Sequence, residues 1–167
     1  MPESPGGNSK LADVLLDSTL ESVDAAEDIV VRAAGSVGFE EDEQHQVGIA
    51  VRESMVNAVA HGNRYSARKK VRLQVTRNAL GIVVEIDDEG KGFDLSDVPD
   101  PRDGDNILRQ SGRGLLMIRA FMDEFEIKRR DPQGTHVRMA KYLPAGQLTQ
   151  KKRSEEHTSE LQSRQYL

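Results

Sequence analysis

Three polar residues recur at four-residue steps in a segment with helical periodicity: Glu53, Asn57 and His61. An α-helix turns about 100° per residue, so these side chains share one face. A carboxylate and a carboxamide one turn apart suit a magnesium-phosphate site, because the amide oxygen can bind a hard cation while the carboxylate orients or deprotonates a nucleophile. The alternative interpretation is a solvated polar stripe on the outer face of a packed helix.

A second motif, Asp88-Glu-Gly-Lys-Gly92, follows an apolar run from Ile82 to Ile86. The run predicts a buried strand that leads into the motif. Gly90 and Gly92 allow positive φ and close approach of a ligand, and Asp88 offers a fixed carboxylate that can accept a hydrogen bond from an adenine amino group. Ordinary strand-to-turn junctions often have the same pattern, so this motif alone is not specific.

A third cluster, Gly112-Arg113-Gly114, precedes an apolar stretch from Leu115 to Met122. We expect a flexible loop that opens an apolar helix, whose first amide groups could contact phosphate. The cluster is not a Walker loop, because no Gly-Lys-Ser/Thr ends it, and no dinucleotide fingerprint accompanies the first strand.

Taken in order, these motifs resemble the GHKL ATPases, the superfamily of gyrase, heat-shock chaperone, histidine-kinase and mismatch-repair ATP-binding domains. The similar segments are residues 53–62 for the N box, 88–92 for the G1 box, 112–116 for the G2 box and 134–137 for the closing strand motif. In its small size and in the segments Asn-Ala-Val-Ala-His-Gly and Ala-Phe-Met-Asp, the chain resembles the RsbW-type anti-sigma-factor serine kinases. The resemblance covers roughly residues 10–143.

This resemblance implies an α+β fold, a two-layer α/β sandwich with a mixed, mainly antiparallel sheet and helices packed on one face. ATP and Mg²⁺ would be the cofactors. Glu53 would act as general base, Asn57 would bind magnesium, and Asp88 would hold adenine with support from Thr135. The remaining lid and phosphate contacts would come from Gly90, Gly92, Gly112, Arg113, Gly114 and Leu115, with Arg113 supplying positive charge near the γ-phosphate. We assign His61 a structural role.

Residues 93–111 contain prolines, a glycine and several aspartates, a composition too polar and broken for a stable element. Loops of that length in a compact domain are usually functional or disordered. We expect a lid over ATP, hinged at Gly92 and Gly112. The alternative is a variable surface loop.

Periodicity and turn residues predict the elements that position these motifs. A strand is expected at 11–16, followed by a helix that Ser18 and Glu21 cap and that runs to about Ala34. The other expected elements are a helix at about 40–60, a hairpin of strands 71–76 and 82–86, and a last hairpin of 124–130 and 135–143. Residues 10–145 would form a single ATP-binding domain between disordered flanks, 1–9 and 146–167.

The last residues carry a distinct signal. The string Arg-Ser-Glu-Glu-His-Thr-Ser-Glu-Leu-Gln-Ser at 153–163 is the translation of a sequence that resembles a common sequencing-library adapter. We therefore expect residues 153–167 to be an artefact and exclude them from fold reasoning.

Composition restricts the function classes. A length of 167 residues suits one domain, and the absence of cysteine excludes disulfides and thiol catalysis. A net charge of -5 and an aromatic content of 4% disfavour binding to nucleic acid. No apolar leader or membrane span is visible in the sequence, so we expect a cytoplasmic protein.

The resemblance implies a protein serine/threonine kinase that phosphorylates a small anti-sigma antagonist of the STAS type and binds a sigma factor by partner switching, as a homodimer. One alternative is a non-catalytic module in which ATP only gates partner binding. Another is a histidine-kinase-like ATPase domain, which we disfavour because no helix with a phospho-accepting histidine precedes residue 53. An intact Glu53 favours the enzyme, since an adaptor has no chemical need for a base there.

Overall fold

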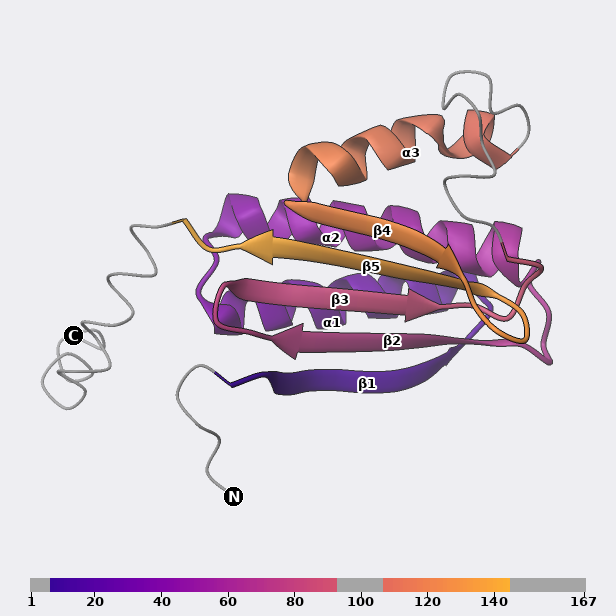
Figure 1. Cartoon of the computed structure of the whole chain (residues 1–167), viewed down its shortest axis with the longest axis horizontal. Coiled ribbons are helices and arrows are strands. Elements are labelled where there is room, and N and C mark those ends of the chain that lie inside the picture. The colour runs from indigo at the N-terminus through magenta and orange to yellow at the C-terminus, as the bar shows by residue number, and fades with distance from the viewer. Residues whose placement is uncertain (1–6, 93–106, 145–167) are drawn as a thin grey trace, which may run out of the picture.

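The computed structural model describes residues 7–92 and 107–144, with the side chains of 107–113 left out. Its strands form one sheet in the order β1-β2-β3-β5-β4 (Figure 1). Their bounds are β1 Ser9–Asp17, β2 Lys70–Arg77, β3 Gly81–Asp87, β4 Glu124–Arg129 and β5 Thr135–Tyr142. The helices are α1 Leu20–Val37, α2 Glu41–Val56, the π-helical η1 Asn57–Gly62 and α3 Ile107–Phe121.

Each neighbouring pair of strands in the described residues is antiparallel, so the expectation of a mixed sheet is wrong. Parallel neighbours need a crossover connection. Here α1 and α2 form a helical hairpin that returns the chain to the end of the sheet where β1 stops, and β2 therefore runs back along β1. The two predicted β-hairpins, β2–β3 and β4–β5, are confirmed.

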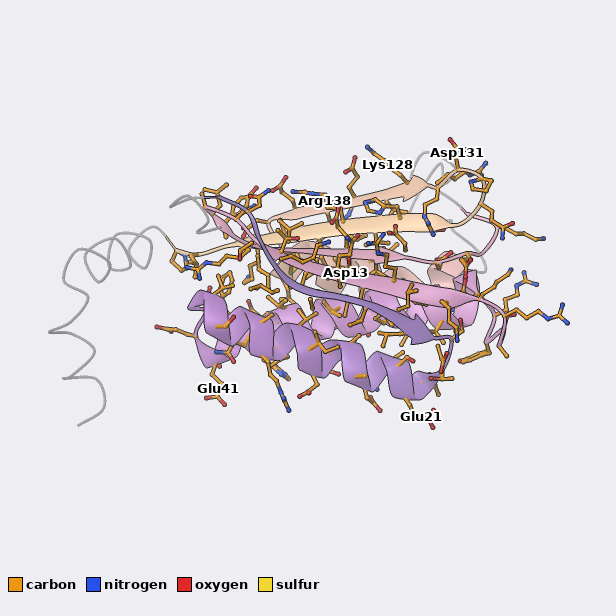
Figure 2. The ribbon with its side chains drawn as sticks, turned by 90° about the horizontal axis from the view of Figure 1, so that it is seen from below. Asp13, Glu21, Glu41, Lys128, Asp131 and Arg138 are labelled. Carbon is orange, nitrogen blue, oxygen red and sulfur yellow. The ribbon has the colours of Figure 1, made fainter. Side chains whose placement is uncertain are left out.

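The helices cover one face of the sheet, which confirms the two-layer α+β fold (Figure 1). Along β2, buried Val71, Leu73 and Val75 alternate with more exposed polar residues, as the period of two requires. The opposite face is charged: Figure 2 shows Lys128 and Arg138 on the side of the sheet away from the helices, which carry Glu21 and Glu41. In the described part of the chain, none of the helices is long and apolar enough to cross a membrane.

The N-cap of helix α1 lies one residue later than predicted. The side chain of Thr19, not Ser18, accepts a hydrogen bond from the Ser22 amide at 3.2 Å. Both residue types are good N-caps, but the Ser18 hydroxyl is engaged elsewhere, donating to the carbonyl of Lys69 at 2.6 Å. The helix also continues past Ala34 to Val37, whose buried side chain extends the apolar stripe.

Helix α3 begins at Ile107, inside the segment expected to be a loop, and the expected loop Gly112-Arg113-Gly114 is helical. Two glycines in a helix cost about 1 kcal/mol each relative to alanine. The buried side chains of Leu115, Ile118 and Met122, at three- and four-residue steps, anchor this helix and offset that cost. The rest of the expected lid, residues 93–106, lies outside the described residues.

The flanks that we expected to be disordered, 1–9 and 146–167, lie almost wholly outside the described residues. The exception is residues 7–9, where β1 already begins at Ser9. The segment 153–167, expected to be an artefact, lies entirely outside the described residues.

The long helix expected at 40–60 changes character near its end. Its α-helical part stops at Val56, and Asn57–Gly62 form a π-helical turn. Such wide turns occur within helices mostly as single turns and frequently at functional sites. The turn carries Asn57 and His61, two of the three polar residues whose spacing first suggested a site.

Asn63, directly after this turn, joins three segments of backbone. It is 1% exposed. Its side-chain Nδ2 donates to Ser18 Oγ at 2.9 Å and to the Lys70 carbonyl at 3.0 Å, while Oδ1 accepts from the Glu89 amide at 2.7 Å. One buried side chain therefore fixes the end of η1 against the start of β2 and the turn after β3.

We predict that Asn63→Ala destabilises the fold, because it leaves buried polar groups without partners, each costing roughly 1–3 kcal/mol. Urea unfolding should show a loss of at least about 2 kcal/mol. The exposed Asn8→Ala is the matched control and should stay within about 0.5 kcal/mol of the parent. Equal stability of the two variants would contradict the linking role of Asn63.

Candidate functional site

The centre of the site is a buried carboxylate at the end of β3. The strand residues from Ile82 to Ile86 are mostly buried, so the chain leaves the sheet with Asp88 still inside, at 5% exposure. Asp88 Oδ1 accepts hydrogen bonds from the Gly90 amide at 2.9 Å and the Thr135 amide at 3.1 Å. Among the described residues Oδ2 receives no hydrogen bond, so this oxygen is available to a ligand.

The Asp88 carboxylate has room beside the end of η1 because position 62 is a glycine. A Cβ on Gly62 would stand 2.4 Å from Asp88 Oδ2, and a Cβ on Gly90 would stand 2.2 Å from the Gly62 carbonyl oxygen. Atoms cannot approach that closely, so neither position admits a side chain without movement of the backbone. The two glycines thus let the end of η1 and the turn after β3 pack directly against each other.

Burial also changes the acidity of this group. Desolvation raises the pKa of Asp88 above its ordinary value of 3.8, although the amides of Gly90 and Thr135 and the positive charge of Arg130 act in the opposite direction. Arg130 lies close by and donates to the Asp88 carbonyl oxygen at 2.7 Å. The charged carboxylate is therefore short of favourable partners, and a hydrogen-bond donor on a ligand would stabilise it.

Asp88 opens into a pocket between the sheet and the helices that contains about 740 Å³ of empty space, part of it open to solvent. The apolar lining comes from Ala58, Ile86, Leu115, Ile118, Phe125, Ile127 and Val137, and the polar and glycine lining from Ser54, Asn57, His61, Gly62, Arg64, Asp88, Lys91, Gly92 and Thr135. A flat, mostly apolar group with a few polar atoms fits this lining.

The polar residues that line the pocket differ in their exposure to solvent. Asp88 and Thr135 are both 5% exposed, Asn57 and His61 are half-buried, and the cationic Lys91 is exposed. Arg64, also exposed, has φ 52°, in the left-handed region that few residues adopt. The lining therefore combines a buried part, which can recognise an uncharged ring, with an exposed cationic part, here called the outer end, whose charge suits an anion.

The predicted site residues fall into three groups. Asn57, Asp88, Gly92, Leu115 and Thr135 line the pocket together. Glu53, Gly90 and Gly114 adjoin it without lining it. Gly112 and Arg113 lie in the backbone of α3, and the side chain of Arg113 is outside the described residues.

Glu53 lies at the contact between α2 and α3. A Cβ on Gly114 would stand 2.6 Å from Glu53 Oε2, so the absence of a side chain at 114 lets α3 approach this carboxylate. Glu53 is one helical turn before Asn57. Its carboxylate therefore lies at the contact between α2 and α3, outside the lining of the pocket.

Ser54, Asn63 and Arg64 are among the residues at or beside this site that sequence reasoning missed. Ser54 stands four residues from both Ala50 and Ala58, which are buried, so its spacing placed it on the inner face of the helix. Asn63 and Arg64 gave no local signal, because their roles depend on segments that are distant in the sequence.

Within the described ranges, no group of three or more His, Asp or Glu side chains is arranged to hold a metal ion. A magnesium ion at this site would therefore depend on Asn57 together with the phosphates of a ligand, an arrangement that Mg²⁺ commonly adopts.

Comparison with known proteins agrees with this geometry. The histidine kinase-like ATPase domain matches residues 16–141, and the chain belongs to this family. Family membership agrees with the resemblance to GHKL ATPases and implies that the chain binds ATP.

Comparison with individual proteins shows which proteins the chain is similar to. The anti-sigma F factor of Bacillus subtilis (strain 168) is 32% identical over 104 residues, which span 61% of this chain and 71% of that protein. The anti-sigma F factor of Clostridium botulinum (strain Eklund 17B / Type B) is 31% identical over 102 residues, 60% of this chain and 71% of that protein. This chain is thus similar to anti-sigma F factors over most of their length.

We predict that Asp88→Asn changes the pH dependence of stability in the absence of nucleotide. The raised pKa means that the folded protein holds the Asp88 proton more tightly than the unfolded chain does. The resulting stability is fully present below pH 3.8 and is lost as the pH rises through the folded pKa. Urea unfolding over a pH series should therefore show the parent losing stability relative to Asp88→Asn as the pH rises.

The control for this measurement is Asp28→Asn, which removes an exposed carboxylate from α1. Its pH profile should follow the parent. Parallel profiles for the parent and Asp88→Asn would contradict the unfavourable burial of this charge.

Proposed function

We propose that this protein is an ATP-dependent protein serine kinase that also acts as an anti-sigma factor. It would transfer the γ-phosphate of ATP to a serine of a small STAS-type antagonist protein, and bind a sigma factor when unphosphorylated antagonist is scarce. The anti-sigma F factors to which the chain is similar support the sigma-factor partner. A homodimer, the state that the family resemblance implies, is part of the proposal.

The observation that carries the nucleotide assignment is the arrangement of Asp88. One oxygen is held by two backbone amides, and the other faces a mostly apolar pocket. A fixed carboxylate accepts hydrogen bonds only, so it favours the amino group of adenine and repels the carbonyl oxygen that guanine has at the same position. The lining of Ile86, Ile118 and Val137 suits the faces of a flat ring.

The outer end of the pocket suits the phosphates. Lys91 and Arg64 bring positive charge to its lining, and Gly92 leaves the backbone accessible. The side-chain oxygen of Asn57 is the protein ligand that we assign to magnesium. When bound with the nucleotide, magnesium neutralises charge on the phosphates.

The position of Glu53 supports its assignment as general base. The base must contact the incoming serine hydroxyl and not the adenine ring, so it belongs beside the phosphate end and outside the apolar pocket. Glu53, one turn from Asn57 and next to Gly114 of α3, meets this requirement. We propose that its carboxylate orients the serine hydroxyl and accepts its proton during transfer.

A second candidate function is an ATP-gated binding module without catalysis. The observation in its favour is the same contact, because the Glu53 carboxylate lies against α3 and could serve only to position that helix. The two candidates differ in whether a partner becomes phosphorylated.

Substitutions of Glu53 in α2 and of Asn57 in η1 test which of these two functions the protein has. Glu53→Gln keeps the shape of the side chain and removes its basicity, so ATP binding should survive while phosphoryl transfer falls, typically by about 10²- to 10⁴-fold for loss of a general base. Asn57→Ala should weaken both binding and transfer, because it removes the magnesium ligand. Calorimetric titration with MgATP and single-turnover transfer from γ-labelled ATP to candidate antagonists would measure both properties.

The matched control is Glu41→Gln, an exposed carboxylate in the first turn of the same helix. It should bind and transfer like the parent. Transfer at the parental rate by Glu53→Gln would exclude Glu53 as the base. If the parent phosphorylates no antagonist while ATP still tightens partner binding, the binding module is the correct function.

A further inference from the structure

Ser54, in the last turn of α2, has an unusual environment. It is 2% exposed, and among the described residues its hydroxyl is the only buried side-chain nitrogen or oxygen without a hydrogen-bond partner. Other buried polar side chains have partners: Ser18 bonds to Lys69, Asn63 to Ser18, and Asp88 to Gly90. The exception therefore needs an explanation specific to Ser54.

A buried serine within a helix can satisfy itself locally, by donating to the carbonyl of the residue four positions earlier. For Ser54 that residue is Ala50, and no such bond is present. A buried hydroxyl without a partner is unfavourable in the folded protein. An alanine at this position would avoid the cost, as Ala50 and Ala58 do on the same face of the helix.

The position of Ser54 indicates what the hydroxyl serves. Ser54 lines the same pocket as Asp88 and Thr135, and all three are at most 5% exposed. Asn57, one turn further along, is half-buried, while Lys91 is exposed. Ser54 therefore belongs to the buried part of the pocket lining, as Asp88 does, and not to its exposed cationic part.

We propose that the Ser54 hydroxyl, turned about χ1 from its buried position toward a bound nucleotide, is a second group for recognition of the nucleobase. It donates a hydrogen bond to a ring nitrogen of adenine beside the amino group whose hydrogen bond Asp88 accepts. The inference rests on the proposed nucleotide function. The exocyclic amino group of adenine has a ring acceptor on each side, N1 of the six-membered ring and N7 of the five-membered ring. A donor next to a carboxylate acceptor therefore complements this edge of adenine.

A role in recognising the base and a role in packing predict different effects of Ser54→Ala on ATP affinity and on melting temperature. Removing a neutral hydrogen bond to the base should weaken ATP binding about 3- to 10-fold. Without nucleotide, the variant should melt at the same temperature as the parent or higher, because an unpaired buried hydroxyl has been removed. Ser36→Ala, at an exposed position on α1, is the control and should change neither quantity.

Analogues of ATP that lack one ring nitrogen identify the bonded atom. Calorimetry should be run with ATP, 1-deaza-ATP and 7-deaza-ATP on the parent and on Ser54→Ala. The analogue without the partner nitrogen should bind the parent about 3- to 10-fold more weakly than ATP, and Ser54→Ala should cause no further loss for that analogue. The other analogue should keep the full effect of the substitution.

Two results would overturn the inference. One is parental affinity of Ser54→Ala for ATP. The other is an equal loss for ATP and both analogues with a lower melting temperature, which would mean that Ser54 supports packing. Failure of the underlying nucleotide function is a different result, the absence of saturable ATP binding by the parent, and it would overturn both proposals together.

Discussion

The burial of the Asp88 carboxylate is the constraint on which the arrangement of the site depends. Its Oδ1 atom takes hydrogen bonds from two amides that are 45 residues apart in the chain, those of Gly90 and Thr135. Both amides must reach one oxygen atom, so the turn after β3 and the start of β5 have to meet in a single arrangement. On the other side, Gly62 brings the end of η1 within contact distance of Oδ2. The pocket is the space that these three segments and the helices leave between them.

Asn63 extends this arrangement to the edge of the sheet. Through its side chain the turn after β3 is tied to the start of β2 and to Ser18, where β1 passes into α1. Consecutive residues, Gly62 and Asn63, thus combine close backbone packing with a fully bonded amide. The two interactions hold the end of η1, the start of β2, the turn after β3 and the β1–α1 junction together at one end of the sheet, on the right in Figure 1.

Much of this fold could be predicted from the sequence. A sheet covered on one face imposes a period of two, and the alternation in Val71 to Thr76 located β2 correctly. The errors came where tertiary contacts outweigh local preference. Ser18 and Thr19 are both suitable caps, and only the distant partners Lys69 and Asn63 decide between them.

For the site, motif spacing identified Asn57, Asp88 and Thr135, which line one pocket. Their assigned roles stay predictions. The loop expected at Gly112 to Gly114 was wrong, because glycine there serves contact between helices and not flexibility. The roles of Asn63 and Ser54 could not be read locally, since asparagine and serine side chains in proteins are mostly exposed and their buried partners are distant in the sequence or absent.

The alternation of β3 has a consequence for how the length of this chain can vary. Ile86 faces the pocket, while the neighbouring Asp87 lies on the opposite face of the sheet, 2.5 Å from Nδ1 of His136. Insertion or deletion of one residue within β3 would exchange the two faces and turn Asp88 out of the pocket. The turn between β2 and β3, which Asn78 closes at the far end of the sheet, carries no such restriction (Figure 1). Divergent members of the family should therefore differ in length at that turn and keep the count of residues from Ile82 to Asp88 constant.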